Sequence, residues 1–130
     1  MTEKRIAYEG TFYTVEWFFD EKGISQPLEY YEKQPGEKKR KLVQLFKVMC
    51  EHGKIFDETK FRNEGDKIYA FKPQPDRYLC FFFQDKRIIV TNAFLKKSPK
   101  LPNGEKEQAL KALKSYQKRL KDGSYYEEES

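Results

Sequence analysis

The sequence has few residues of the kinds that build disulfides, metal sites or redox centres. Its 130 residues include two cysteines and one histidine. Cys50 and Cys80 have no second pair for a CxxC or zinc motif, and we interpret both as small buried hydrophobic residues in a reducing compartment. No group of acidic residues has metal-ligand spacing. We therefore expect neither a metal nor another cofactor.

Long apolar runs are also missing. The N-terminal residues 1–5 have no apolar signal core, and no stretch approaches the length of a membrane-spanning helix. We therefore expect a cytoplasmic protein without a membrane partner. The length suits one domain with a real core, which we assign to residues 1–121.

Charge is present but unevenly placed. Residues 86–121 contain 11 basic and 2 acidic residues, a balance of +9, whereas the whole chain carries +5. This balance points to a polyanionic partner, although a lysine-coated helix face accounts for part of it. The last nine residues, 122–130, are acidic and low in aliphatic side chains. We predict that they form a disordered acidic tail.

Periodicity predicts an α+β fold. Ser25 is a plausible N-cap of a short helix that ends near residues 35–36, and Gly53 is a good terminator for the next helix. Asn103 is a candidate cap for a final helix. The fold class that follows is an antiparallel sheet packed with two helices, plus a C-terminal helix. The expected sheet is a central three-stranded meander plus an N-terminal strand or hairpin. The predicted segments are strands at 6–8 and 12–19, helices at 25–36 and 37–52, three strands within 67–97, and a helix from 103 to about 121.

The expected lengths of the hairpin loops place several basic residues at one end of this sheet. A four-residue loop, 73–76, places Lys72 opposite Arg77, and like charges that face each other are unfavourable unless an anion lies between them. A two-residue turn at residues 85–86 pairs Arg77 with Phe94 and puts Lys96 diagonally beside it. A one-residue slip would put Lys97 there instead.

Three cations and one aromatic ring at a sheet end resemble a nucleic-acid phosphate site with a stacking platform. The alternative is a solvated, lysine-rich sheet end that blunts aggregation. A second basic run, residues 38–41, lies on the first turns of a predicted helix. The helix dipole disfavours cations there, so this run is either a binding surface or a solvated face.

The same region resembles a known toxin family. The segments 68–72, 77–79 and 88–102, followed by a helix with Ala109 and Tyr116, are similar to the RelE/ParE toxin superfamily, and most of all to its phage-derived HigB-like branch. Two departures are Ala70, at a position often acidic in relatives, and Ala93, where a glycine is usual before Phe94.

The resemblance implies a toxin of a type II toxin–antitoxin system, neutralised by a cognate antitoxin that we expect to be a helix-turn-helix protein. RelE and HigB members are mRNA interferases, endoribonucleases that cut messenger RNA on the ribosome. ParE members poison DNA gyrase with the same fold, so the fold alone does not decide the function. A third reading is a non-catalytic nucleic-acid-binding module.

Cleavage of RNA on this pattern needs a base for the ribose 2′-OH, cations for the developing charge and an acid for the leaving oxygen. We assign catalysis to Lys72, Arg77, Lys96 and Lys97, with a lysine as base and Arg77 on the phosphate. Substrate binding is assigned to Phe94, Lys100 and Tyr116. Core packing is the alternative for Phe94 and the favoured reading for Tyr116, which otherwise is a candidate acid. His52 reads as a surface residue at a helix end.

Overall fold

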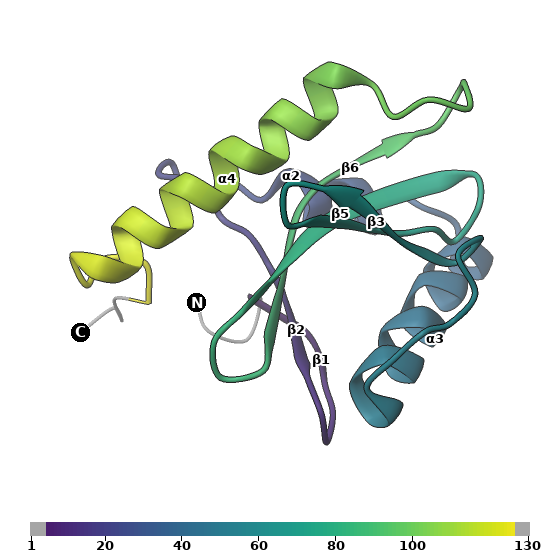
Figure 1. Ribbon diagram of the computed structural model, residues 1–130, viewed down its shortest axis with the longest axis horizontal. Helices are drawn as coiled ribbons and strands as arrows, with labels where there is room; N and C mark the ends of the chain where they lie inside the picture. Colours follow the sequence, from purple (N-terminus) through teal and green to yellow (C-terminus); the bar gives the residue numbers. More distant parts are fainter. Residues whose placement is uncertain (1–4, 127–130) are drawn as a thin grey trace.

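A computed structural model describes residues 5–126, and within that range the chain forms a six-stranded mixed sheet with three helices (Figure 1). The strands are β1 (Ile6–Glu9), β2 (Thr14–Trp17), β3 (Phe61–Gly65), β4 (Ile68–Phe71), β5 (Asp76–Phe83) and β6 (Arg87–Leu95). The helices are α2 (Gln26–Glu32), α3 (Gly36–His52) and α4 (Asn103–Lys121). The α+β class predicted from periodicity is confirmed.

The strand order is β1-β2-β6-β5-β4-β3, and β2 pairs with β6 in parallel. The other neighbours are antiparallel, so the prediction of an antiparallel sheet is wrong at this one junction. Two parallel strands need a long crossover. Here that crossover contains α2, α3 and three strands, and no local pattern reveals where its last strand will dock.

The predicted three-stranded meander has a fourth member, β3. Only Phe61 among its five residues is buried, so the segment lacks the alternation that marks a strand. Asp66 and Lys67 join β3 to β4 with φ of 55° and 71°, the left-handed conformation that suits a two-residue hairpin turn.

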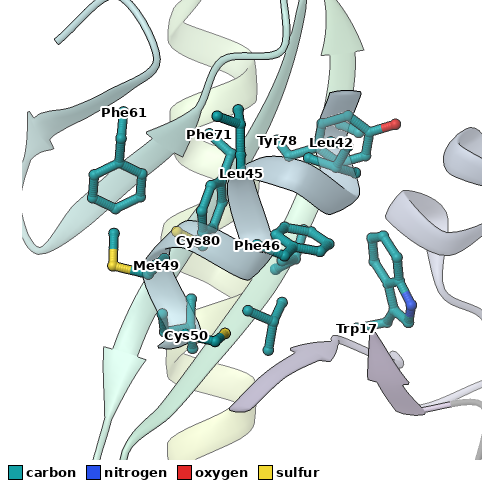
Figure 2. Packing of buried hydrophobic residues seen from close by; sticks show 14 residues of the cluster. Trp17, Leu42, Leu45, Phe46, Met49, Cys50, Phe61, Phe71, Tyr78 and Cys80 are labelled. Atoms are coloured by element: carbon teal, nitrogen blue, oxygen red, sulfur yellow. The ribbon is translucent and has the colours of Figure 1, made fainter. Parts of the chain in front are cut away.

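Helices cover both faces of the sheet. On the α3 face, one core brings Trp17 and Phe46 together with side chains of the central strands (Figure 2). On the opposite face, α4 packs Ala109, Ala112 and Tyr116 onto β5 and β6. The central strand β5 is therefore buried on both sides, as its apolar run predicts.

Both cysteines are buried and free, in agreement with the sequence prediction. Ser25 caps α2 by accepting a hydrogen bond from the Leu28 N–H, and Gly53 ends α3 with φ of 83°. Asn103 does not cap α4: it is the first helical residue, and Pro102 occupies the cap position without a side-chain bond. None of the three described helices is long and apolar enough to cross a membrane.

The predicted disordered tail is wrong for the part that the structure describes, residues 122–126. The Tyr125 ring stacks on Phe18 at 5.9 Å, and its hydroxyl accepts a hydrogen bond from the Phe19 N–H at 3.1 Å. The Tyr126 hydroxyl donates to Glu16 at 2.7 Å. Two aromatic rings supply the apolar surface that the acidic composition conceals. The rest of the predicted tail, 127–130, lies outside the described residues.

Candidate functional site

The basic residues of interest gather where β4 ends, β5 begins and β6 ends. Arg77 pairs with Phe94, as predicted, but by a different route. The β5–β6 loop has three residues, because Phe83 pairs with Arg87, and a bulge near Thr91 restores the expected offset. The longer loop shifts the strand register by one residue and the bulge shifts it back. The pair predicted from a two-residue turn is therefore the pair that the structure has.

Arg77 is held by its own loop. It is 7% exposed, and its Nη1 donates to Gln74 Oε1 at 3.2 Å, to the Pro75 carbonyl at 3.2 Å and to the Asp76 carbonyl at 3.0 Å. Nε and Nη2 have no hydrogen-bond partner among residues 5–126. All three acceptors are neutral oxygens, so the guanidinium is positioned while its charge stays uncompensated by contact. Such an arrangement leaves donors free for a phosphate oxygen.

Lys72 lies at the opposite side of the same hairpin mouth. Phe71 pairs with Tyr78, and this register continues to Lys72 beside Arg77. Lys72 is 8% exposed, and its Nζ donates to the Glu58 carbonyl at 2.9 Å. Burial lowers the pKa of Lys72, and the positive charges of Arg77 and Lys96 lower it further. A lysine with a lowered pKa has a larger neutral fraction and can accept a proton.

The two lysines after β6 are not equivalent. Lys96 is half-buried, and its N–H donates to the Pro75 carbonyl at 3.3 Å, which ties it to the Arg77 loop. The positive charge of Lys96 lowers the pKa of Lys72. Lys97 and Lys100 are both exposed, in the segment that leads to α4. Lys72, Arg77 and Lys96 are therefore brought together at one place, and we call these three residues the cation cluster.

Two of the predicted substrate-binding residues, Phe94 and Tyr116, are buried in the core on the α4 side of the sheet. Phe94 is 7% exposed and packs in the α4-side core, so it offers little ring surface for stacking. Tyr116 is fully buried and contacts Phe81 and Phe83, near the far end of β5. Four to six residues of a strand separate it from Arg77, roughly 13–20 Å. Tyr116 is thus not placed to act on a substrate at the cation cluster.

Beside these cations lie two charged residues of β3 that sequence reasoning missed. Arg62 pairs with Ala70, and its charge helps to lower the pKa of Lys72. Glu64 has the opposite effect on the pKa values of both Lys72 and Arg77. Since β3 has no alternation, the only available signal was its turn residues, Gly65 and Asp66.

Asp76, the residue before Arg77 in β5, is a buried charge at 2% exposure. Its carboxylate accepts a hydrogen bond from the Tyr30 hydroxyl at 2.5 Å and pairs with Lys38 Nζ at 3.5 Å. Burial raises the pKa of Tyr30, and Asp76 raises it further. The negative charge of Asp76 is therefore satisfied from α2 and α3 rather than by Arg77.

His52 is exposed in the last turn of α3, as expected from its position at a helix end. Within residues 5–126, no three His, Cys, Asp or Glu side chains come together as a metal site would require. The chemistry available at the cluster is thus that of one arginine and two lysines, with the charged side chains of Arg62 and Glu64 nearby.

Comparison with known proteins gives a match over more than half of the chain. Residues 29–114 match the family described as Phage derived protein Gp49-like (DUF891). The matched range contains α3, four strands from β3 to β6 and the cation cluster. No curated protein is similar enough to match.

Proposed function

The chain belongs to the Phage derived protein Gp49-like family, a family of the RelE/HigB-like toxin type, and on this basis we propose that it is a ribosome-dependent messenger RNA endonuclease. A toxin of this type implies an antitoxin partner, which we expect to be encoded beside it. The single observation that carries the nuclease assignment is Arg77, positioned by neutral oxygens and beside a lysine of lowered pKa.

The proposed reaction is attack of a ribose 2′-OH on the adjacent phosphate. Lys72, in its neutral form, takes the 2′-OH proton while the new O–P bond forms. Arg77 donates from Nε and Nη2 to the non-bridging oxygens, where negative charge develops. Lys96, as the ammonium ion, protonates the 5′-oxygen as its bond to phosphorus breaks. The products are a 2′,3′-cyclic phosphate and a 5′-hydroxyl end, and no metal takes part.

The positions of Phe94 and Tyr116 support the proposal that cleavage depends on the ribosome. Phe94 is packed in the core, and Tyr116 lies at the other end of β5, so neither is available to orient a base. An enzyme with a phosphate site but no stacking ring gains little orientation of the reacting groups by itself. We therefore expect messenger RNA to be presented in the correct geometry by the ribosomal A site.

The test maps RNA ends in cells that express either the parent or the Arg77→Lys variant. We expect 5′-hydroxyl ends within translated codons for the parent and few for the variant, and we expect purified protein to cut free RNA poorly. DNA breaks at gyrase sites in place of RNA cuts would overturn the nuclease assignment in favour of a gyrase poison. A neighbouring helix-turn-helix protein that co-purifies would support the toxin assignment independently.

A further inference from the structure

A second basic surface lies next to the cation cluster, on the α3 side of the sheet. A cleft of about 670 Å³ opens between α3 and the segments that precede β3 and follow β4. Four cations line it, with Glu37 as the one acidic residue in its wall. The four are Arg40, Lys41, Lys60 and Lys72.

The basic run 38–41 divides into two pairs with different surroundings. Lys38 forms the ion pair with Asp76, and Lys39 lies over the Tyr31 ring at 5.6 Å. Both are half-buried and have structural partners. Arg40 and Lys41 are exposed and line the cleft instead. Contacts within the fold therefore account for Lys38 and Lys39 but not for Arg40 and Lys41.

Among the described residues, the cations of the cleft are not in direct ion pairs, although Asp57 lies close enough for the charges of Lys60 and Lys72 to lower its pKa. Within residues 5–126, none of Arg40, Lys41 and Lys60 forms an ion pair, and the Lys72 ammonium donates to a neutral carbonyl. Like charges gathered in one hollow repel each other. A bound polyanion would convert this repulsion into attraction.

The cleft is continuous with the cation cluster through two residues. Lys72 belongs to both. Gln74 lines the cleft, donates to the Thr59 carbonyl at 2.8 Å and accepts from Arg77 at 3.2 Å. A chain held in the cleft therefore lies beside the loop residue that holds the guanidinium of Arg77.

We propose that this cleft binds the sugar–phosphate backbone of single-stranded RNA adjacent to the scissile phosphate. The proposal deepens the nuclease function and rests on it. The residue types of the lining favour RNA over a protein segment, because Leu45 and Pro73 are the apolar residues among the ten that line the cleft. The other eight are four cations, two amides, Thr59 and Glu37. Protein interfaces need a larger apolar centre that is depleted of charge.

The test measures binding of single-stranded RNA whose 2′-hydroxyls are methylated, so that it is not cleaved. The variant is Arg40→Ala/Lys41→Ala/Lys60→Ala, three exposed positions whose change leaves the core intact. We expect binding about tenfold to a hundredfold weaker near 0.1 M salt. The slope of log affinity against log salt should fall by about 2, since each lost phosphate contact on a single strand is worth about 0.7.

The matched control is Lys114→Ala/Lys118→Ala/Lys121→Ala, three exposed lysines of α4 that remove the same charge. An equal loss in the control would show a general charge effect and overturn the cleft. Unchanged RNA binding in the cleft variant, or parent protein that binds no RNA, would also overturn it. Lost antitoxin binding with intact RNA binding would identify a protein-docking surface instead.

The result is separable from the nuclease function. If the parent cuts messenger RNA in cells and the cleft variant binds methylated RNA like the parent, the cleft assignment fails and the nuclease assignment stands. If no RNA cuts occur but the variant loses RNA affinity and salt slope relative to the control, the nuclease assignment fails and the cleft still binds RNA.

Discussion

Two arginines at opposite ends of the β5–β6 hairpin have opposite surroundings. Arg87 is surrounded by partners: its nitrogens donate to the Gln84 carbonyl, to the Tyr116 hydroxyl at 3.0 Å and to Asp85 at 3.3 Å. Its guanidinium also lies over the rings of Phe83 and Tyr126. Arg77 uses one nitrogen, on neutral oxygens of its own loop.

The difference separates structural charge from available charge. Arg87 joins a network in which Tyr116 bonds to Tyr126, Tyr126 to Glu16, and Glu16 pairs with Arg5. Every charge there is compensated within the fold, which favours a stabilising role. Arg77 lies near Glu64 and Asp76 without pairing with either, and together with Lys96 it lowers the pKa of Lys72 by charge repulsion. The folded protein keeps this repulsion, which is expected where a polyanion binds.

The largest expected effect comes from Arg77→Lys. Lysine keeps the charge but loses the two free donors of the guanidinium fork, so RNA cleavage should fall by about 10²–10³. The rate of growth arrest under titrated expression and the yield of 5′-hydroxyl ends would measure it. The free energy of unfolding should change by less than about 1 kcal/mol, because Nζ can still donate to the loop carbonyls. A fully toxic variant would refute the role of Arg77.

The second effect tests the docked tail at the Arg87 end. Tyr125→Ala/Tyr126→Ala should lower the free energy of unfolding by about 2–3 kcal/mol, because two packed rings and a bond to buried Glu16 are lost. Urea denaturation would measure it. The Tyr125→Phe/Tyr126→Phe control keeps the rings and should lose only about 1 kcal/mol. A double alanine variant as stable as the parent would mean that the tail does not dock.

Arg87→Lys is the counterpart of the first substitution. It should lower the free energy of unfolding by about 1–2 kcal/mol, since the Tyr116 hydroxyl loses its donor and the ring contacts weaken. Growth arrest should stay at the parental level under conditions where the variant is folded. Loss of RNA cleavage without loss of stability would break the comparison between the two arginines.

The smallest effect is on the pH dependence of stability at Lys72. Its folded pKa is lowered from the ordinary 10.5, so between that lowered value and 10.5 the unfolded chain binds more protons than the folded one. The parental free energy of unfolding should therefore gain a rising contribution with pH across this window. In Lys72→Met that contribution disappears, and the variant should be no less stable than the parent at neutral pH. Urea titrations between pH 7 and pH 10 would detect it, and an unchanged slope would contradict the lowered pKa.

Prediction from the sequence worked where the determinants are local. The helix predicted at 37–52, the Ser25 cap and the Gly53 terminator follow from periodicity and capping chemistry within a few residues. The Arg77–Phe94 pair was reached because hairpin register depends on chain length between strands. The bulge and the longer loop shift the register in opposite directions, so the pairing of Arg77 with Phe94 is unchanged.

At the candidate site, the sequence placed Lys72, Arg77 and Lys96 together but did not separate Lys96 from Lys97. The structure distinguishes the two lysines, because Lys96 is half-buried and bonded to the Pro75 carbonyl while Lys97 is exposed. In the structure, Tyr116 lies against Phe81 and Phe83 and not at the candidate site. The helical register that places Tyr116 in the core gives no information on which end of β5 it meets.

The sequence by itself determined the helices, the hairpin β5–β6 and the excess of basic residues, because each depends on neighbours along the chain. Only the tertiary structure decided the parallel pairing of β2 with β6, the β3 edge with Glu64, the docked tyrosines and the division of the run 38–41. These features join segments far apart in sequence. Their stability comes from burial and charge compensation between surfaces that meet only after folding, so no local pattern encodes them.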